Sequence, residues 1–154
     1  MAETVEDRLK ALGLTLPEAV APVANYVPAV LAGSLLHVSG QLPMENGKPK
    51  LVGNLGDGVS VEDAAACARI CALHVLAQVK AAVGDLSKVK RIVKVVGFVA
   101  SAPGFTDQPK VVNGASDLFV AALGDAGRHA RSSVGVAMLP LGVPVEVEAI
   151  FEIA

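Results

Sequence analysis

The chain has 154 residues, a formal net charge of −2 and 53% hydrophobic residues, with no Trp and a single Tyr. This length is sufficient for one domain over residues 1–154, with a core built mainly from Val, Leu and Ala. The near balance of 13 basic and 15 acidic side chains disfavours nucleic acid as a partner, since phosphate binding draws on clustered Lys and Arg. No apolar run predicts a membrane span, and the acidic N-terminus lacks the pattern of a secretion signal, so we expect a cytoplasmic protein.

The first half of the chain predicts one short helix followed by a pair of strands. Thr4 and Asp7 have the spacing of a capping box, which predicts a helix up to about Leu12. The β-branched and Gly-rich segments that follow predict strands at residues 25–31 and 35–42, and a long loop at 43–58 with one short strand at 50–52.

The second half predicts two long helices and three strands. Ser60 is a good N-cap and Gly84 a good stop for the longest helix, over residues 61–83. Pro109 opens a second helix that runs to about Leu123. Strands are predicted at residues 89–100, between His129 and a Pro- and Gly-rich turn at 139–144, and at 145–153. This order of elements indicates an α+β fold with helices on one face of the sheet.

The last strand alternates apolar and mostly acidic side chains, which predicts one buried face and one exposed face. Its apolar positions are Val145, Val147, Ala149, Phe151 and Ile153, and the opposite positions are Glu146, Glu148, Ile150 and Glu152. We expect its partner across the turn to be the strand that begins at Arg131. One arginine and one glutamate on a rigid sheet are suited to binding and protonating a small anion.

Several segments resemble, in order, the Rid (reactive intermediate deaminase) or YjgF-like family. They are Asn25-Tyr26-Val27, Val38-Ser39-Gly40-Gln41-Leu42-Pro43, Val112-Asn113, Ala130-Arg131-Ser132 and Val145-Glu146-Val147-Glu148-Ala149. The combination of Ser-Gly-Gln-hydrophobic-Pro with a distant Ala-Arg-Ser is specific, and the likeness is to a longer subgroup, with residues 1–20 as an N-terminal extension. It implies a chorismate-mutase-like fold, with a mixed or antiparallel sheet and two long helices on one face. It also implies a homotrimeric barrel with sites in the clefts between neighbours.

The resemblance assigns two candidate catalytic residues. Arg131 matches an arginine that binds the substrate carboxylate, a role that suits its planar fork of donors; an ordinary salt bridge is the alternative. Glu146 matches an acid that positions or activates the attacking water. Half burial would raise the pKa of Glu146 toward neutrality, whereas a solvated strand carboxylate is the alternative.

The same resemblance places five substrate-binding residues at the pocket: Tyr26, Ser39, Gly40, Asn113 and Ser133. Interface packing is the alternative for the ring of Tyr26, and the helix surface for Asn113. Many relatives carry cysteine at the position of Ser133, so nucleophilic cysteine chemistry is ruled out there. His129 titrates near neutral pH and is a candidate for tuning the charge of the cleft.

No metal or organic cofactor is expected. Cys67, Cys71 and His74 share one helix face, but the first and last are about 10.5 Å apart along the axis, too far for ligands of one zinc ion. Buried thiols beside a packed or interface histidine are the better interpretation. The basic segment at residues 88–94 predicts a solvated strand edge.

These features predict a hydrolase that converts 2-enamines or 2-imines to 2-keto acids and ammonia, of the 2-iminobutanoate/2-iminopropanoate deaminase type. The alternative is a non-catalytic trimer of the same fold that binds small carboxylates. Chorismate rearrangement lacks support, because a dicarboxylate demands several basic residues around one cleft.

Overall fold

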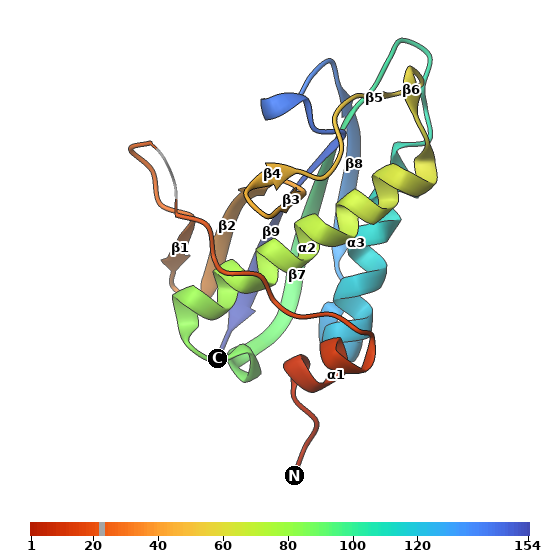
Figure 1. Cartoon of the computed structure of the whole chain (residues 1–154). Coiled ribbons are helices and arrows are strands. Elements are labelled where there is room, and N and C mark those ends of the chain that lie inside the picture. The colour runs from red at the N-terminus through yellow and green to blue at the C-terminus, as the bar shows by residue number, and fades with distance from the viewer. Residues whose placement is uncertain (22–23) are drawn as a thin grey trace.

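The computed structural model describes residues 1–21 and 24–154, in which a five-stranded mixed sheet carries two long helices on one face (Figure 1). The strand order is β1-β2-β9-β7-β8. The sheet strands are β1 (Ala29–Ala32), β2 (Leu35–Gln41), β7 (Val89–Ala100), β8 (Ala130–Val136) and β9 (Val145–Ile153). The α+β fold expected from the sequence, with a mixed sheet and two long helices on one face, is confirmed.

The remaining elements are helices and short strand pairs. The helices are α1 (Val5–Ala11), α2 (Val61–Val83) and α3 (Gln108–Leu123), and the 3-10 turns are η1 (Leu86–Lys88), η2 (Gly124–Gly127) and η3 (Pro140–Gly142). The short strands are β3 (Met44–Glu45), β4 (Lys48–Pro49), β5 (Asn54–Leu55) and β6 (Gly58–Val59).

Side-chain caps set the ends of the first two helices. Thr4 and Asp7 form the predicted capping box, with both backbone-to-side-chain distances at 3.0 Å. The hydroxyl of Ser60 accepts from the backbone N–H of Asp63 at 3.1 Å and starts α2. By length and composition α2 could cross a membrane, but 61% of its most apolar window is buried in the fold, so it is a core helix.

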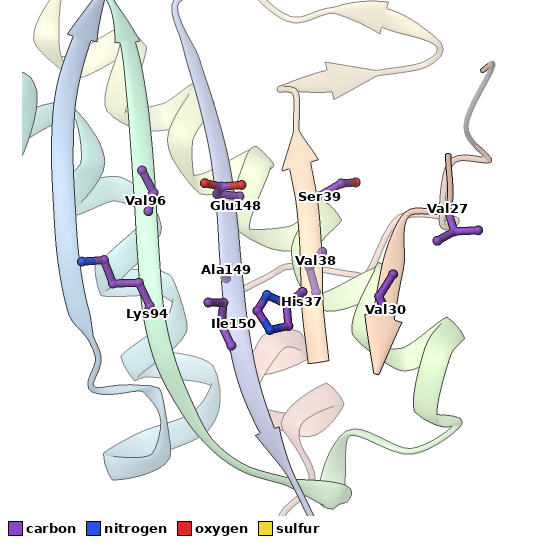
Figure 2. Close-up of a pocket in the computed structure, with 10 residues that line it drawn as sticks. All are labelled: Val27, Val30, His37, Val38, Ser39, Lys94, Val96, Glu148, Ala149 and Ile150. Atoms are coloured by element: carbon purple, nitrogen blue, oxygen red, sulfur yellow. The ribbon is translucent and has the colours of Figure 1, made fainter. Parts of the chain in front are cut away.

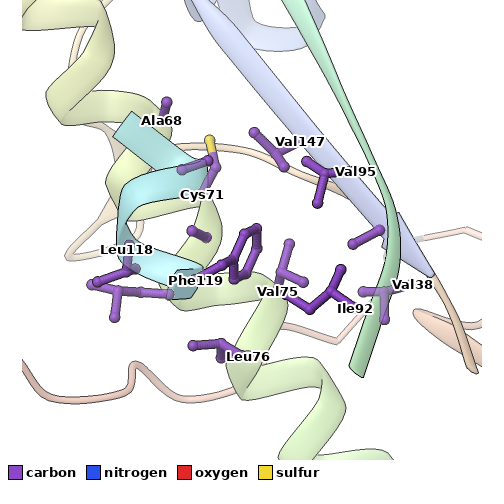
Figure 3. Packing of buried hydrophobic residues seen from close by; sticks show 14 of the residues in the cluster. Val38, Ala68, Cys71, Val75, Leu76, Ile92, Val95, Leu118, Phe119 and Val147 are labelled. Atoms are coloured by element: carbon purple, nitrogen blue, oxygen red, sulfur yellow. The ribbon is translucent and has the colours of Figure 1, made fainter. Parts of the chain in front are cut away.

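The core lies between the helices and the sheet. Phe119 of α3 and Phe151 of β9 are fully buried and meet edge to face, with ring centroids 6.3 Å apart. Figure 3 shows Phe119 among Val75 of α2 and Ile92 and Val95 of β7. The alternation of β9 is confirmed, since its apolar side chains are buried and the side chains between them are half-buried.

The expectation that the last two strands pair with each other was wrong, because β7 lies between them. Strand β9 pairs antiparallel with both β2 and β7, so neither of its edges is open to β8. Strand β8 instead pairs parallel with β7, with Val95 opposite Arg131. The intervening helix α3 makes this possible, since parallel neighbours need a crossover connection rather than a tight turn.

Two strands expected in the N-terminal half differ from the structure. The strand predicted at residues 25–31 begins only at Ala29, because Pro28 lacks an N–H and residues 24–26 form a bend. The short strand predicted at residues 50–52 is absent there; the chain instead forms the β3–β4 hairpin. Its turn is Asn46-Gly47, in which both residues have positive φ, at 53° and 75°. Asn-Gly is a strong hairpin signal that the reading of the sequence overlooked.

The basic segment lies on an uncovered part of β7. Strand β8 begins to pair with β7 only at Lys94, so Lys90 and Arg91 lie on a stretch with β9 on one side. Both side chains are exposed, and Arg91 binds Glu152 of β9 at 2.9 Å. The predicted solvated strand edge is therefore confirmed for the first half of β7.

Candidate functional site

The candidate site residues fall into two groups on opposite faces of the sheet. Arg131 and Ser133 are in register with Val95 and Gly97 of β7, on the face that the helices cover. Glu146 is in register with Phe98, on the open face. Side chains of neighbouring residues in register share a face, so Arg131 and Glu146 do not meet within one chain.

The first group, here called the bulge cluster, consists of Tyr26, Ser39, Gly40 and Glu146. Strand β2 bulges at this point, because Ser39 and Gly40 together stand opposite the single residue Glu148 of β9. Tyr26, Ser39 and Gly40 line a cavity of about 270 Å³, whose wall also includes His74 of α2. The carboxylate of Glu146 contacts Gly40, where a side chain would displace it.

Glu146 has the electrostatic setting of an acid–base group. Desolvation by partial burial, followed by repulsion from the Glu148 carboxylate, raises the pKa of Glu146 above its ordinary value of 4.5. Both carboxylates stand on the open face two residues apart on β9. The expected direction of the shift is thus found, and it brings the carboxyl closer to proton transfer at neutral pH.

The second group, here called the arginine cluster, consists of Arg131, Asn113, Ser116 and Ser133. Nη1 of Arg131 donates to Asn113 Oδ1 at 2.8 Å and to Ser116 Oγ at 3.1 Å. Its Nη2 donates to the carbonyl of Pro109 at 3.4 Å. Within the described ranges no carboxylate comes within ion-pair distance of Arg131, so the salt-bridge alternative has no support in this chain.

These contacts leave one edge of the guanidinium available. A guanidinium has five N–H donors, and the two on Nη1 and one on Nη2 contact α3. Among the residues that the structure describes, Nε and the second Nη2 hydrogen have no acceptor. Nε and Nη2 form the side fork that binds a carboxylate through two parallel hydrogen bonds.

Ser133 is the one buried side-chain hydroxyl without a hydrogen-bond partner among residues 1–21 and 24–154. It lies two residues beyond Arg131 on the same face of β8. A buried hydroxyl without a partner is costly, which makes Ser133 unusual among the buried polar groups of the described residues.

Sequence reasoning missed Ser116, and it did not place His74 beside the bulge cluster. Ser116 follows Asn113 by three residues on α3, which places both on one helix face and was a usable signal. His74 was interpreted as a packed or interface histidine rather than a metal ligand, and its side chain is buried. Its Nε2 lies 2.8 Å from the carbonyl of Met44, so the ring joins α2 to the β3–β4 hairpin beside the bulge cluster.

The open face of the sheet holds a second cavity, of about 320 Å³. Figure 2 shows His37 of β2, Glu148 and Ile150 of β9 and Lys94 of β7 beside it. Exposed apolar side chains lie on the same face: Val30, which lines the cavity, is 51% exposed, and Val134 of β8, in register with Phe98, is 43% exposed. This mixture of charged and apolar groups is unlike either a core or an ordinary solvated surface.

Comparison with known proteins identifies relatives along nearly the whole chain. A family model described as "YjgF/chorismate mutase-like, putative endoribonuclease" matches residues 6–152. Protein TCP17 of Trypanosoma cruzi is 51% identical over 150 residues, which is 97% of this chain and 94% of that protein. The 2-iminobutanoate/2-iminopropanoate deaminase of Salmonella typhimurium is 37% identical over 135 residues, or 86% and 90% of the two chains.

The crystal structure of the protein Atu1372 from Agrobacterium tumefaciens is similar, with a TM-score of 0.92 and 54% identity over 97% of this chain and 92% of that one. The matched residues include the strands and the helix that carry the bulge cluster and the arginine cluster. The chain therefore belongs to the Rid/YjgF-like family.

Proposed function

We propose that this protein hydrolyses 2-imines and 2-enamines of small amino acids to 2-keto acids and ammonia. The observation that carries the proposal is the open Nε–Nη2 edge of Arg131, which is held by three contacts to α3. An α-imino acid carries a carboxylate next to its reacting carbon. A fixed arginine fork that binds this carboxylate orients the imine carbon at the same time.

The active form is proposed to be a trimer in which neighbouring chains share each site. Arg131 and Glu146 lie on opposite faces of one sheet, so a site with both residues requires Glu146 from a neighbouring copy. The apolar and charged open face supports this arrangement, because an adjacent chain would cover Val30 and Val134. The two free cysteines, Cys67 and Cys71, are buried and fit the reducing cytoplasm, which we include in the proposal.

The chemistry needs only water and the groups of the two clusters. Glu146 as carboxylate takes a proton from a water molecule, whose oxygen attacks the imine carbon. The nitrogen is protonated, the carbon–nitrogen bond breaks, and the products are a 2-keto acid and ammonia. The raised pKa of Glu146 suits this role, because it makes the carboxylate a better proton acceptor than an ordinary glutamate. Tyr26 and Ser39 are proposed to fix the water or the substrate from the wall of the cavity.

The test generates 2-aminoacrylate from serine with a dehydratase and follows the release of pyruvate above the spontaneous rate. We expect Arg131→Ala to lose about 2–5 kcal/mol of transition-state binding, or roughly 30- to 5,000-fold in kcat/KM. Arg128→Ala is the matched control, because this exposed arginine lies three residues away and pairs with Asp125. Equal rates for wild type and Arg131→Ala would remove the proposal.

A non-catalytic carboxylate-binding trimer is the second candidate, and it is favoured by the same open arginine edge. Titration calorimetry with 2-oxobutanoate separates the two. Binding that Arg131→Ala abolishes, without any acceleration of imine hydrolysis, would establish the binding protein instead of the enzyme.

A further inference from the structure

The geometry points to Ser116 and His129 as positioning residues for Arg131, linked to it by a chain of hydrogen bonds. Nη1 of Arg131 donates to Ser116 Oγ at 3.1 Å, and Ser116 Oγ lies 2.9 Å from Nε2 of His129. Nδ1 of His129 lies 2.6 Å from the carbonyl of Gly127 in η2. This inference rests on the proposed function, since it explains how the substrate-binding guanidinium is held.

The donors and acceptors along this series of hydrogen bonds determine the tautomer of His129. A backbone carbonyl only accepts, so Nδ1 must carry the proton that Gly127 binds. In the neutral ring Nε2 then accepts, and the Ser116 hydroxyl donates to it. The lone pairs of that hydroxyl remain free for Arg131, so each group in the chain has a partner of the right kind.

The surroundings of His129 favour the neutral ring. Desolvation by burial lowers the pKa of His129 below 6.5, the Gly127 contact opposes this, and the Arg131 charge lowers it further. The ring of Phe119 packs edge-on against it, with centroids 5.9 Å apart. His129 is therefore a neutral, aligned acceptor and adds no charge to the cleft.

These hydrogen bonds also fix the orientation of the Arg131 guanidinium. Ser116 and Asn113 occupy both hydrogens of Nη1, on the side toward α3. One hydrogen of Nη2 is held by the carbonyl of Pro109, so Nε–H and the second Nη2 hydrogen are the donors left for a substrate carboxylate. Without the Ser116 contact the long Arg131 side chain regains rotamer freedom, which substrate binding has to remove again. Losing the Ser116 contact should therefore weaken substrate binding more than it slows the chemical step.

The kinetic test compares Ser116→Ala, Ser116→Thr and Asp117→Ala in the full-length protein. Ser116→Ala is expected to raise KM for the imine about tenfold with kcat little changed, since a hydrogen bond to a charged group is lost. Ser116→Thr keeps the hydroxyl and should restore most of the affinity. Asp117 is the exposed next residue of α3 and serves as the control. A wild-type KM in Ser116→Ala, with activity lost in Arg131→Ala, would overturn the positioning role of Ser116 and His129. The proposed function would remain intact.

A second measurement is independent of turnover. In protein with ¹⁵N-labelled histidine, His129→Gln identifies the ring signals of His129 among the three histidines. We expect a protonated Nδ1 and an Nε2 resonance that moves in both Ser116→Ala and Arg131→Ala. If the wild type releases no keto acid, the proposed function fails. The spectrum still tests whether hydrogen bonds link Arg131, Ser116 and His129. An Nε2-protonated ring, or an Nε2 signal that neither substitution moves, would overturn that link.

Discussion

The carboxylate of Glu146 lies over the α-carbon of Gly40, in the space that a β-carbon at residue 40 would occupy. The two residues come from neighbouring strands, β2 and β9, and meet because β2 bulges at Ser39 and Gly40. Gly40 thus has a specific physical role: it leaves room for an acid on the open face of the sheet.

Gly40→Ala should impair activity far more than stability. The added methyl group meets the end of a flexible side chain, so Glu146 turns away while the backbone stays in place. We expect keto-acid release to fall about 100-fold, and the free energy of unfolding to change by less than about 1 kcal/mol. Enzyme kinetics and urea unfolding measure the two effects. In a Glu146→Ala background, Gly40→Ala should have no further effect on rate; an additive loss would contradict the explanation.

Gly114→Ala should impair stability far more than activity. A β-carbon on Gly114 of α3 would press against the backbone carbonyl of Ala65 in α2, which cannot rotate away. We expect a net loss of about 1–3 kcal/mol of unfolding free energy, despite the better helix propensity of Ala. Asp117→Ala, on the exposed face of the same helix, should change it by less than about 0.5 kcal/mol. An unchanged or higher urea midpoint for Gly114→Ala would show that the helices separate freely.

The raised pKa of Glu146 predicts a pH-dependent contribution to stability. Desolvation and the Glu148 charge hold the folded-state pKa above 4.5, so the unfolded chain releases this proton at a lower pH than the folded chain. Folding is therefore disfavoured as pH rises through the window between the two pKa values. Glu146→Gln should melt at a higher temperature than wild type at neutral pH, and the difference should vanish at about pH 3. Circular dichroism measures both, and exposed Glu18→Gln is the control. A difference that persists in acid would point to another cause.

Neither thiol should react in the folded protein. Burial raises the pKa of Cys67 to about 11, and burial raises the pKa of Cys71 well above its ordinary value of 9.0. With a disulfide reagent at about pH 8 we expect almost no labelling of the native chain, because the thiolate is the reactive form. In denaturant both thiols should react. Rapid labelling of the native chain would mean that α2 opens on the time scale of the reaction.

Local signals predicted much of the fold. Ser60 and Gly84 set the two ends of α2, and the alternation of β9 predicted which side chains are buried. The Asn46-Gly47 turn carried an equally local signal, so the β3–β4 hairpin was predictable though it was not predicted. Such features depend on residues that are close in sequence, where capping, turn geometry and side-chain period act directly.

The placement of the candidate site was a different matter. Sequence alone determined that Arg131 lies at the start of a strand and that Glu146 lies on the side of its strand that faces away from the protein core. It also determined that the chain has the segments of its family. Only the tertiary structure decided that β7 separates these strands, which puts Arg131 and Glu146 on opposite faces. It also brought Ser116 and His129 to Arg131. The physical reason is that strand order follows from competition among non-local pairings, whose register depends on the whole sheet and on the crossover helix that packs against it.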